Sequence, residues 1–181
     1  MRDFSERVRS GLWRGFSGEA IRNVVNLGIG GSDLGPKMAA KALSAYEHPG
    51  LHVHFVSNLD GAQLAPLLET LDPRSTLFIV ASKTFTTQET LRNAQTAREW
   101  LLASAGEENR EAVIARHFVG VTAATEEAGR FGIPQENLFA MMAWRMDLWQ
   151  LRSTSTMSPG ATVECQTILL EVEVPLVTKY R

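Results

Sequence analysis

The stretch VVNLGIGGSDLGP, residues 24–36, joins an apolar run directly to a glycine-rich turn. A short apolar run that ends in glycines is typical of a buried strand that gives way to a helix. Glycine permits positive φ and lets backbone N–H groups face an anion or a sugar. We therefore expect a strand at 24–29, a helix at 34–46, and a ligand close to the turn between them.

Strand-like and helix-like segments alternate along the rest of the chain. Further strands are expected at 52–57, 76–81, 117–121 and 138–141, and further helices at 61–71, 86–104 and 125–131. Continuous apolar runs between helices are typical of a parallel sheet that is buried on both faces. The predicted fold class is α/β, a three-layer αβα sandwich of flavodoxin-like or Rossmann-like topology. In such sheets ligands bind beyond the carboxyl ends of the strands.

The chain divides by composition into three segments. Residues 1–20 indicate a short helix and a loop, and residues 21–143 carry the alternating pattern of the binding domain. Residues 144–181 do not continue it. Their first part is polar and rich in turn residues, and their second part is β-prone but contains Pro175, which favours a sheet edge or a place outside the sheet.

Composition narrows the class of protein. Of the 181 residues, 44% are hydrophobic and 21% are charged, with a formal net charge of -2. This charge gives no electrostatic reason to expect nucleic acid or an anionic membrane as partner. The single cysteine, Cys165, excludes an internal disulfide and fits a cytoplasmic setting. No apolar run is long enough for a transmembrane helix, and the charged start is unlike a secretory signal.

The glycine-rich turn fits neither common nucleotide-binding motif. Counted from Gly28, the sixth position of a G-x-G-x-x-G fingerprint is Asp33, and counted from Gly30 the third position is Ser32. No Lys-Ser or Lys-Thr pair follows, which excludes a P-loop. A dinucleotide-binding protein is therefore disfavoured. The structural alternative to a ligand site is a tight turn in which Ser32 or Asp33 caps the helix.

A second stretch, ASKTFTTQET at 81–90, indicates a phosphate site. Its hydroxyl residues surround the expected start of the long helix, and Lys83 adds a positive charge; they are Ser82, Thr84, Thr86, Thr87 and Thr90. Free N–H groups and the positive end of the helix dipole attract anions at such a place. The stretch lacks P-loop glycines, so a small phosphate monoester is favoured over a nucleotide. The structural alternative, compatible with this one, is a capping box of Thr86 and Glu89.

The histidines and tryptophans carry less information. His52 and His54 share one face of a strand, and His117 begins another. No histidine spacing typical of a metal site occurs, so neither a metal nor a cofactor is expected. The four tryptophans are interpreted as core or interface residues.

These stretches together resemble the glucose-6-phosphate isomerase family. The resemblance rests on VVNLGIGGSDLGP, on SNLDG at 57–61, on LFIVASKTFTTQETLRNAQTAREWL at 77–101 and on HFVGVTAATEEAGRFGI at 117–133. It covers residues 1–144, an interior piece of the longer family chain that corresponds to its first sugar-isomerase (SIS) domain. It implies a SIS-like domain and a cytoplasmic enzyme of glycolysis and gluconeogenesis that interconverts glucose 6-phosphate and fructose 6-phosphate through an enediol, without a metal. Carried over by motif, Ser82, Lys83, Thr84 and Thr87 hold the phosphate, Lys83 through its backbone, and Gly31 and Ser32 line the sugar end.

The chain departs from the family after Trp144. The family's W-V-G-G-R-Y-S is replaced here by WRMDLWQ, so no role passes to Arg145. The family's glutamate base, ring-opening histidine and C-terminal lysine have no counterpart, and no catalytic residue is assigned. We expect a truncated sugar-phosphate-binding portion that is inactive alone. The alternative is a non-catalytic sugar-phosphate-binding or regulatory module with a purposeful tail.

Self-association is also expected from the sequence. The long helix at 86–101 carries Leu91, Trp100 and Leu101, and little chain remains to cover them. A large uncovered apolar patch is rarely left free in solution. Trp144 and Trp149 add apolar surface nearby in the sequence. We therefore expect a homo-oligomer that forms through this face, or a chain that is soluble only with a partner.

Overall fold

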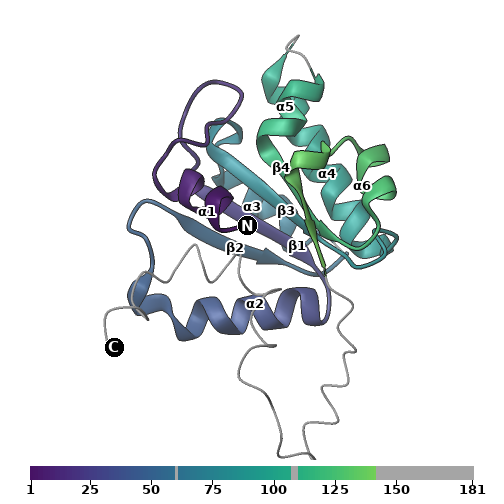
Figure 1. The fold of residues 1–181 in the computed structure, drawn as a ribbon, viewed down its shortest axis with the longest axis horizontal. Helices are drawn as coiled ribbons and strands as arrows, with labels where there is room; N and C mark the ends of the chain where they lie inside the picture. The colour runs from purple at the N-terminus through teal and green to yellow at the C-terminus, as the bar shows by residue number, and fades with distance from the viewer. Residues whose placement is uncertain (60, 107–109, 142–181) are drawn as a thin grey trace, which may run out of the picture.

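A five-stranded, all-parallel sheet forms the centre of the molecule (Figure 1). A computed structural model describes residues 1–59, 61–106 and 110–141. The strands are β1 (Asn23–Gly28), β2 (His52–Val56), β3 (Thr76–Ala81), β4 (Phe118–Thr122) and β5 (Leu138–Ala140). They lie in the order β2-β1-β3-β4-β5. This arrangement confirms the α/β class and the parallel sheet.

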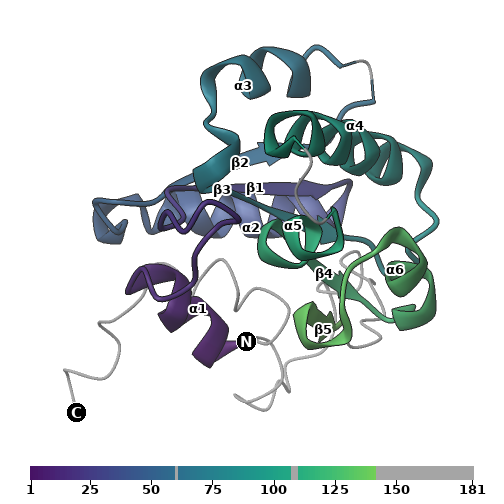
Figure 2. The ribbon, with the colours of Figure 1, turned by 90° about the horizontal axis from the view of Figure 1, so that it is seen from above.

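Helices cover both faces of the sheet (Figure 2). They are α1 (Arg2–Arg9), α2 (Gly31–Ala42), α3 (Leu64–Thr70), α4 (Gln88–Ala105), α5 (Arg110–His117) and α6 (Thr125–Phe131), with short 3-10 turns at Ser44–Tyr46, Pro73–Ser75 and Gln135–Asn137. One core cluster joins the sheet to α3, α4, α5 and α6. A second cluster joins the opposite face to α1 and to the loop that follows it. The three predicted layers are therefore present.

Burial on both faces explains why the central strands are mostly apolar. Every residue of β3 is buried, and five of the six residues of β1 are buried. The edge strand β2 is more exposed, which suits its two histidines. The loop that follows α1 is also tied to the fold, because Trp13 is buried and its Nε1–H donates to the carbonyl oxygen of Arg116 at 2.9 Å.

The strand order creates a topological switch point between β1 and β3. From β1 the chain passes through α2 to β2 on one side, and then crosses back to β3 on the other side of β1. Ligands of open α/β sheets bind outside the carboxyl ends of the strands at such a point. The two stretches singled out in the sequence begin at the ends of these two strands.

Two expectations about the elements and their packing are wrong. Residues 110–117 form a helix, α5, that was not expected, so His117 ends a helix and does not begin a strand. The apolar side of α4 is also covered, contrary to expectation, because Leu101 is fully buried and Leu91 and Trp100 pack against the core. The large exposed apolar side chains in the described ranges lie elsewhere: Leu12, Ile29, Leu34, Met38, Tyr46 and Leu59. The segment 144–181, with Trp144, Trp149 and Pro175, lies outside the described residues, so the prediction for this tail is not tested.

Candidate functional site

Two turns leave the sheet side by side at the switch point. We call residues 28–32 the glycine turn and residues 82–87 the hydroxyl turn. Gly28 at the end of β1 is paired in register with Ala81 at the end of β3. Neighbouring parallel strands lie about 4.8 Å apart, so the two turns begin next to each other. The sequence-predicted phosphate and sugar residues therefore emerge at one edge of the sheet.

The glycine turn starts α2 without a side-chain cap. The N-cap is Gly30, with φ 61° and ψ -125°, and no side chain bonds to the helix start. The alternative in which Ser32 or Asp33 caps the helix is therefore wrong, because both residues already lie inside the helix. The N–H groups of Ser32 and Asp33 bond to the backbone carbonyls of Ile29 and Gly30, at 3.3 and 3.1 Å, and no side-chain oxygen caps the start of the helix.

A buried amide holds the glycine turn against the sheet. Asn26 is 1% exposed, and its Nδ2 donates to the carbonyl oxygen of Ser32 at 2.9 Å. This contact brings the first turn of α2 close to β1: a Cβ atom on Gly28 would lie 2.7 Å from the carbonyl oxygen of Ser32. Gly28 is therefore required by a close backbone approach, while Gly31 and Ser32 remain partly exposed.

The hydroxyl groups of the hydroxyl turn bond to one another. Ser82 Oγ and Thr87 Oγ1 are 3.0 Å apart, and Thr84 Oγ1 and Thr86 Oγ1 are 2.7 Å apart. The N-cap of α4 is Thr87, which makes no side-chain cap bond. The capping box of Thr86 and Glu89 is therefore wrong, because Thr86 lies one residue before the cap. Four hydroxyls thus gather at a helix start that no side chain caps.

Backbone hydrogen bonds fix the hydroxyl turn to the neighbouring strand. The N–H of Ser82 donates to the carbonyl oxygen of Val121 at 3.1 Å. The carbonyl oxygen of Lys83 accepts from the N–H of Ala123 at 3.0 Å and from Thr122 Oγ1 at 3.2 Å. Over the described residues, no hydrogen bond engages the N–H groups of residues 83, 84, 86 or 87. These donors and the exposed Lys83 side chain leave the turn suited to an anion.

The structure thus brings Ser82, Lys83, Thr84 and Thr87 together in one turn and places Gly31 and Ser32 in the adjacent one. Sequence reasoning missed Phe85, which lies within the hydroxyl turn with φ 50° and is 3% exposed. Nothing in the local sequence signals this conformation, because phenylalanine rarely adopts positive φ.

The histidines have structural roles. His117 is fully buried; its Nδ1 lies 2.6 Å from the carbonyl oxygen of Thr76, and its Nε2 accepts from the N–H of Phe16 at 2.9 Å. The Nδ1–H tautomer satisfies both contacts, and burial lowers the pKa of His117. Burial, together with the neighbouring His52, also lowers the pKa of His54. His117 ends α5 just before β4, and His54 lies in the middle of β2, so neither belongs to the two turns.

Within the described part of the chain, no group of three or more His, Cys, Asp or Glu residues could hold a metal ion. No helix there is long and apolar enough to cross a membrane.

Known proteins match the chain over most of its length. The family model described as phosphoglucose isomerase matches residues 1–158. A glucose-6-phosphate isomerase of Dechloromonas aromatica is 58% identical over 149 residues, which are 81% of this chain and 28% of the relative. Glucose-6-phosphate isomerase 2 of Chromobacterium violaceum is 57% identical over 152 residues, 82% of this chain and 27% of the relative.

Solved structures agree. The crystal structure of a glucose-6-phosphate isomerase from Chlamydia trachomatis superposes with a TM-score of 0.58 at 29% identity, over 77% of this chain and 24% of the other. This chain spans little more than a quarter of the length of the curated relatives above. Both turns lie at one edge of the sheet, and the family model and the relatives match most of the chain. The chain therefore belongs to the phosphoglucose isomerase family.

Proposed function

We propose that this chain is the sugar-phosphate-binding portion of a glucose-6-phosphate isomerase. The phosphate lies in the hydroxyl turn, held by the side chains of Ser82, Thr84 and Thr87 and by the backbone of Lys83. The sugar end lies against Gly31 and Ser32. The observation that carries the proposal is the pairing of Gly28 with Ala81, which sets the two turns next to each other. The names of the curated relatives supply the substrate class.

We propose that this chain alone binds the sugar phosphate but does not catalyse its isomerisation. Isomerisation through an enediol requires a general base within hydrogen-bond reach of the C–H proton that it removes. The hydroxyl turn offers hydroxyls, amides and one lysine, and the glycine turn offers amides and Ser32. None of these is a carboxylate or an imidazole, and the family's base motif has no counterpart in the sequence. The two turns therefore bind the substrate and do not remove its proton.

An activity assay tests the second half of the proposal. The purified chain is assayed for conversion of fructose 6-phosphate to glucose 6-phosphate after removal of host isomerase. We expect no turnover above a mock preparation from the same host. Turnover that follows the purified chain and saturates with substrate would contradict it, and would require a base that the two turns do not supply.

An NMR titration tests the first half. Glucose 6-phosphate is added to the isotope-labelled chain, and we expect shifts concentrated at residues 30–35 and 82–90. With part of the site missing, a millimolar Kd corresponds to about 4 kcal/mol. Glucose without phosphate is the control and should give no shifts at residues 82–90. Shifts confined to other parts of the sheet would place the ligand elsewhere and refute the assignment.

We also propose that the chain associates with itself and that it works in the cytoplasm. The exposed apolar side chains Leu34 and Met38 lie one turn apart on α2, at 65% and 67% exposure. Apolar groups at this spacing favour contact with another surface, and we expect the isolated chain to associate with itself. Light scattering across dilution checks this, and a concentration-independent monomer mass would contradict it.

A further inference from the structure

Phe85 has a backbone conformation that its side chain disfavours. Its φ is 50°, and it is the one non-glycine residue in the described ranges with positive φ. This region brings Cβ too close to the backbone and is uncommon for any residue with a bulky side chain. Such strain persists only where surrounding structure enforces it, and it occurs preferentially at functional sites. The question is what enforces it here and what the turn gains.

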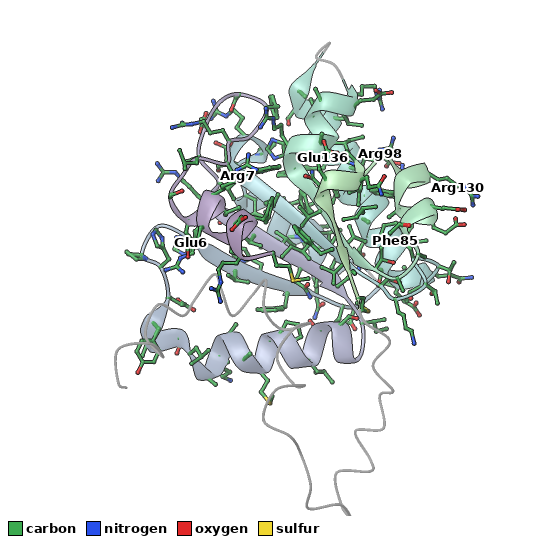
Figure 3. The ribbon with its side chains drawn as sticks, in the orientation of Figure 1. Glu6, Arg7, Phe85, Arg98, Arg130 and Glu136 are labelled. Carbon is green, nitrogen blue, oxygen red and sulfur yellow. The ribbon has the colours of Figure 1, made fainter. Side chains whose placement is uncertain are left out.

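The aromatic ring of Phe85 is anchored in the core. The side chain is 3% exposed and belongs to the larger apolar cluster. Its ring meets Phe131 edge-on at 6.0 Å, and Phe131 in turn meets Phe118 at 5.8 Å. The guanidinium of Arg98 lies 5.3 Å from the Phe131 ring. Figure 3 shows Phe85 on the side of the molecule that carries Arg98 and Arg130. Burial and ring contacts of this kind offset the backbone strain.

The inward ring and the reversed backbone together shape the hydroxyl turn. The N–H of Phe85 donates to the carbonyl oxygen of Ser82 at 3.3 Å, which closes a tight turn. The flanking residues Thr84 and Thr86 are exposed, and their hydroxyls are 2.7 Å apart across Phe85. One buried residue between two exposed ones therefore holds both hydroxyls on the outer side of the turn.

We infer that Phe85 is a positioning residue for phosphate binding. Its core-anchored ring holds the hydroxyl turn in the shape that receives the anion, although Phe85 itself does not touch the ligand. A glycine would adopt φ 50° without strain but would leave the turn unanchored. The free-energy cost of ordering the turn would then reduce the binding affinity. The inference rests on the proposed function, because it concerns the same phosphate site.

Substitutions at Phe85 test the inference in the full chain. Inorganic phosphate and glucose 6-phosphate are titrated against Phe85→Gly, Phe85→Leu and the unsubstituted chain. We expect Phe85→Gly to weaken both affinities about tenfold or more, the fold-change of one lost hydrogen bond to a charged group. Phe85→Leu keeps an apolar anchor and should recover much of the loss. Unchanged affinities in Phe85→Gly would overturn the inference.

A matched core variant separates positioning from general destabilisation. Leu64 belongs to the same core cluster, is 2% exposed and lies on α3. Leu64→Ala should lower the free energy of unfolding and leave both affinities unchanged. An affinity loss in Leu64→Ala equal to that in Phe85→Gly would show that Phe85 acts only through stability, and would also overturn the inference.

Hydrogen exchange gives a readout that does not depend on the ligand. The N–H groups of Ser82 and Ala123 donate to Val121 and Lys83, so they report on the turn directly. In Phe85→Gly they should exchange faster relative to the N–H of Arg22, which bonds to Ser75 at the other end of β3. If the unsubstituted chain binds neither phosphate compound, the proposed function fails and the phosphate role of Phe85 fails with it, and faster exchange in Phe85→Gly would then show only that the ring holds the turn. Unaltered exchange at both positions would refute it.

Discussion

The glycine turn and the hydroxyl turn each contain a residue with positive φ, but this residue is a glycine in the first and a phenylalanine in the second. Each turn connects a parallel strand to a helix that no side chain caps. In the glycine turn that residue is Gly30, around which a Cβ would meet nothing within 4 Å. In the hydroxyl turn it is Phe85, whose ring is buried. Glycine provides the conformation by removing the side chain, and phenylalanine is held in it by tertiary contacts.

The difference gives the two turns different surfaces. The glycine turn exposes backbone next to a close helix–strand contact and adds few side-chain donors. The hydroxyl turn adds four hydroxyls and a lysine, and its backbone is bonded to β4 and the residues after it. This contrast supports the proposed division of the ligand: the hydroxyl turn supplies the several directed donors that a phosphate needs, and the glycine turn leaves room for the close approach of a sugar.

The largest effect is expected from removing donors in the hydroxyl turn. Thr84→Ala combined with Thr87→Ala should abolish detectable binding of glucose 6-phosphate in the NMR titration. Each lost hydrogen bond to a charged group costs about 1.5–3 kcal/mol, which is comparable with the whole affinity expected here. Thr96→Ala, an exposed threonine farther along α4, is the control and should bind normally. Retained binding by the double variant would mean that the hydroxyls of Thr84 and Thr87 do not hold the phosphate.

The next effect is expected at the close approach of the glycine turn. In Gly28→Ala the new Cβ would meet the carbonyl oxygen of Ser32 at 2.7 Å, so backbone has to shift. We expect a loss of about 1–3 kcal/mol in the free energy of unfolding, measured by urea denaturation. Gly129→Ala in α6 meets nothing within 4 Å and should be neutral or slightly stabilising. Equal stability of the two variants would show that the first turn of α2 can move away from β1 at no cost.

A smaller effect is expected at Gly30, where space is open and only conformation matters. Gly30→Ala places a side chain at φ 61° and ψ -125°, at a cost of about 1–3 kcal/mol if the backbone keeps this conformation. Because nothing blocks relaxation, we expect a loss at the lower end of this range in urea denaturation. A loss larger than that of Gly28→Ala would mean that conformation, and not close approach, governs the glycine turn.

The smallest effect is a pH dependence at the opposite end of β3. Burial lowers the pKa of His117 below its ordinary value of 6.5, so the unfolded chain binds the proton more readily than the folded one. Its contribution to stability is therefore full above pH 6.5 and is lost as the pH falls from there through the folded-state pKa. Urea denaturation at several pH values should show this fall. His117→Gln should reduce it and leave the contribution of His54, whose pKa is also lowered. An unchanged slope in that variant would assign the pH dependence to groups other than His117.

Much of the fold could be predicted from local sequence. Apolar runs and helical spacing located β3 and α6 at their observed bounds and placed the remaining strands within a residue or two. The boundary between α5 and β4 could not be found in this way, because Arg110–His117 runs directly into β4 with no glycine or proline between them. The bonds from His117 to Phe16 and Thr76 hold that junction, and they join residues far apart in the sequence.

The sequence by itself determined which residues are chemically suited to a phosphate and a sugar, because hydroxyls, lysine and glycine carry those properties wherever they lie. Only the tertiary structure decided that the two sets meet, since residues 31–32 and 82–87 become neighbours through the pairing of β1 with β3 and not through the order of the chain. It also decided how the helices begin and how Phe85 is held. The positive φ of Phe85 depends on contacts with β4 and Phe131 that no local pattern encodes.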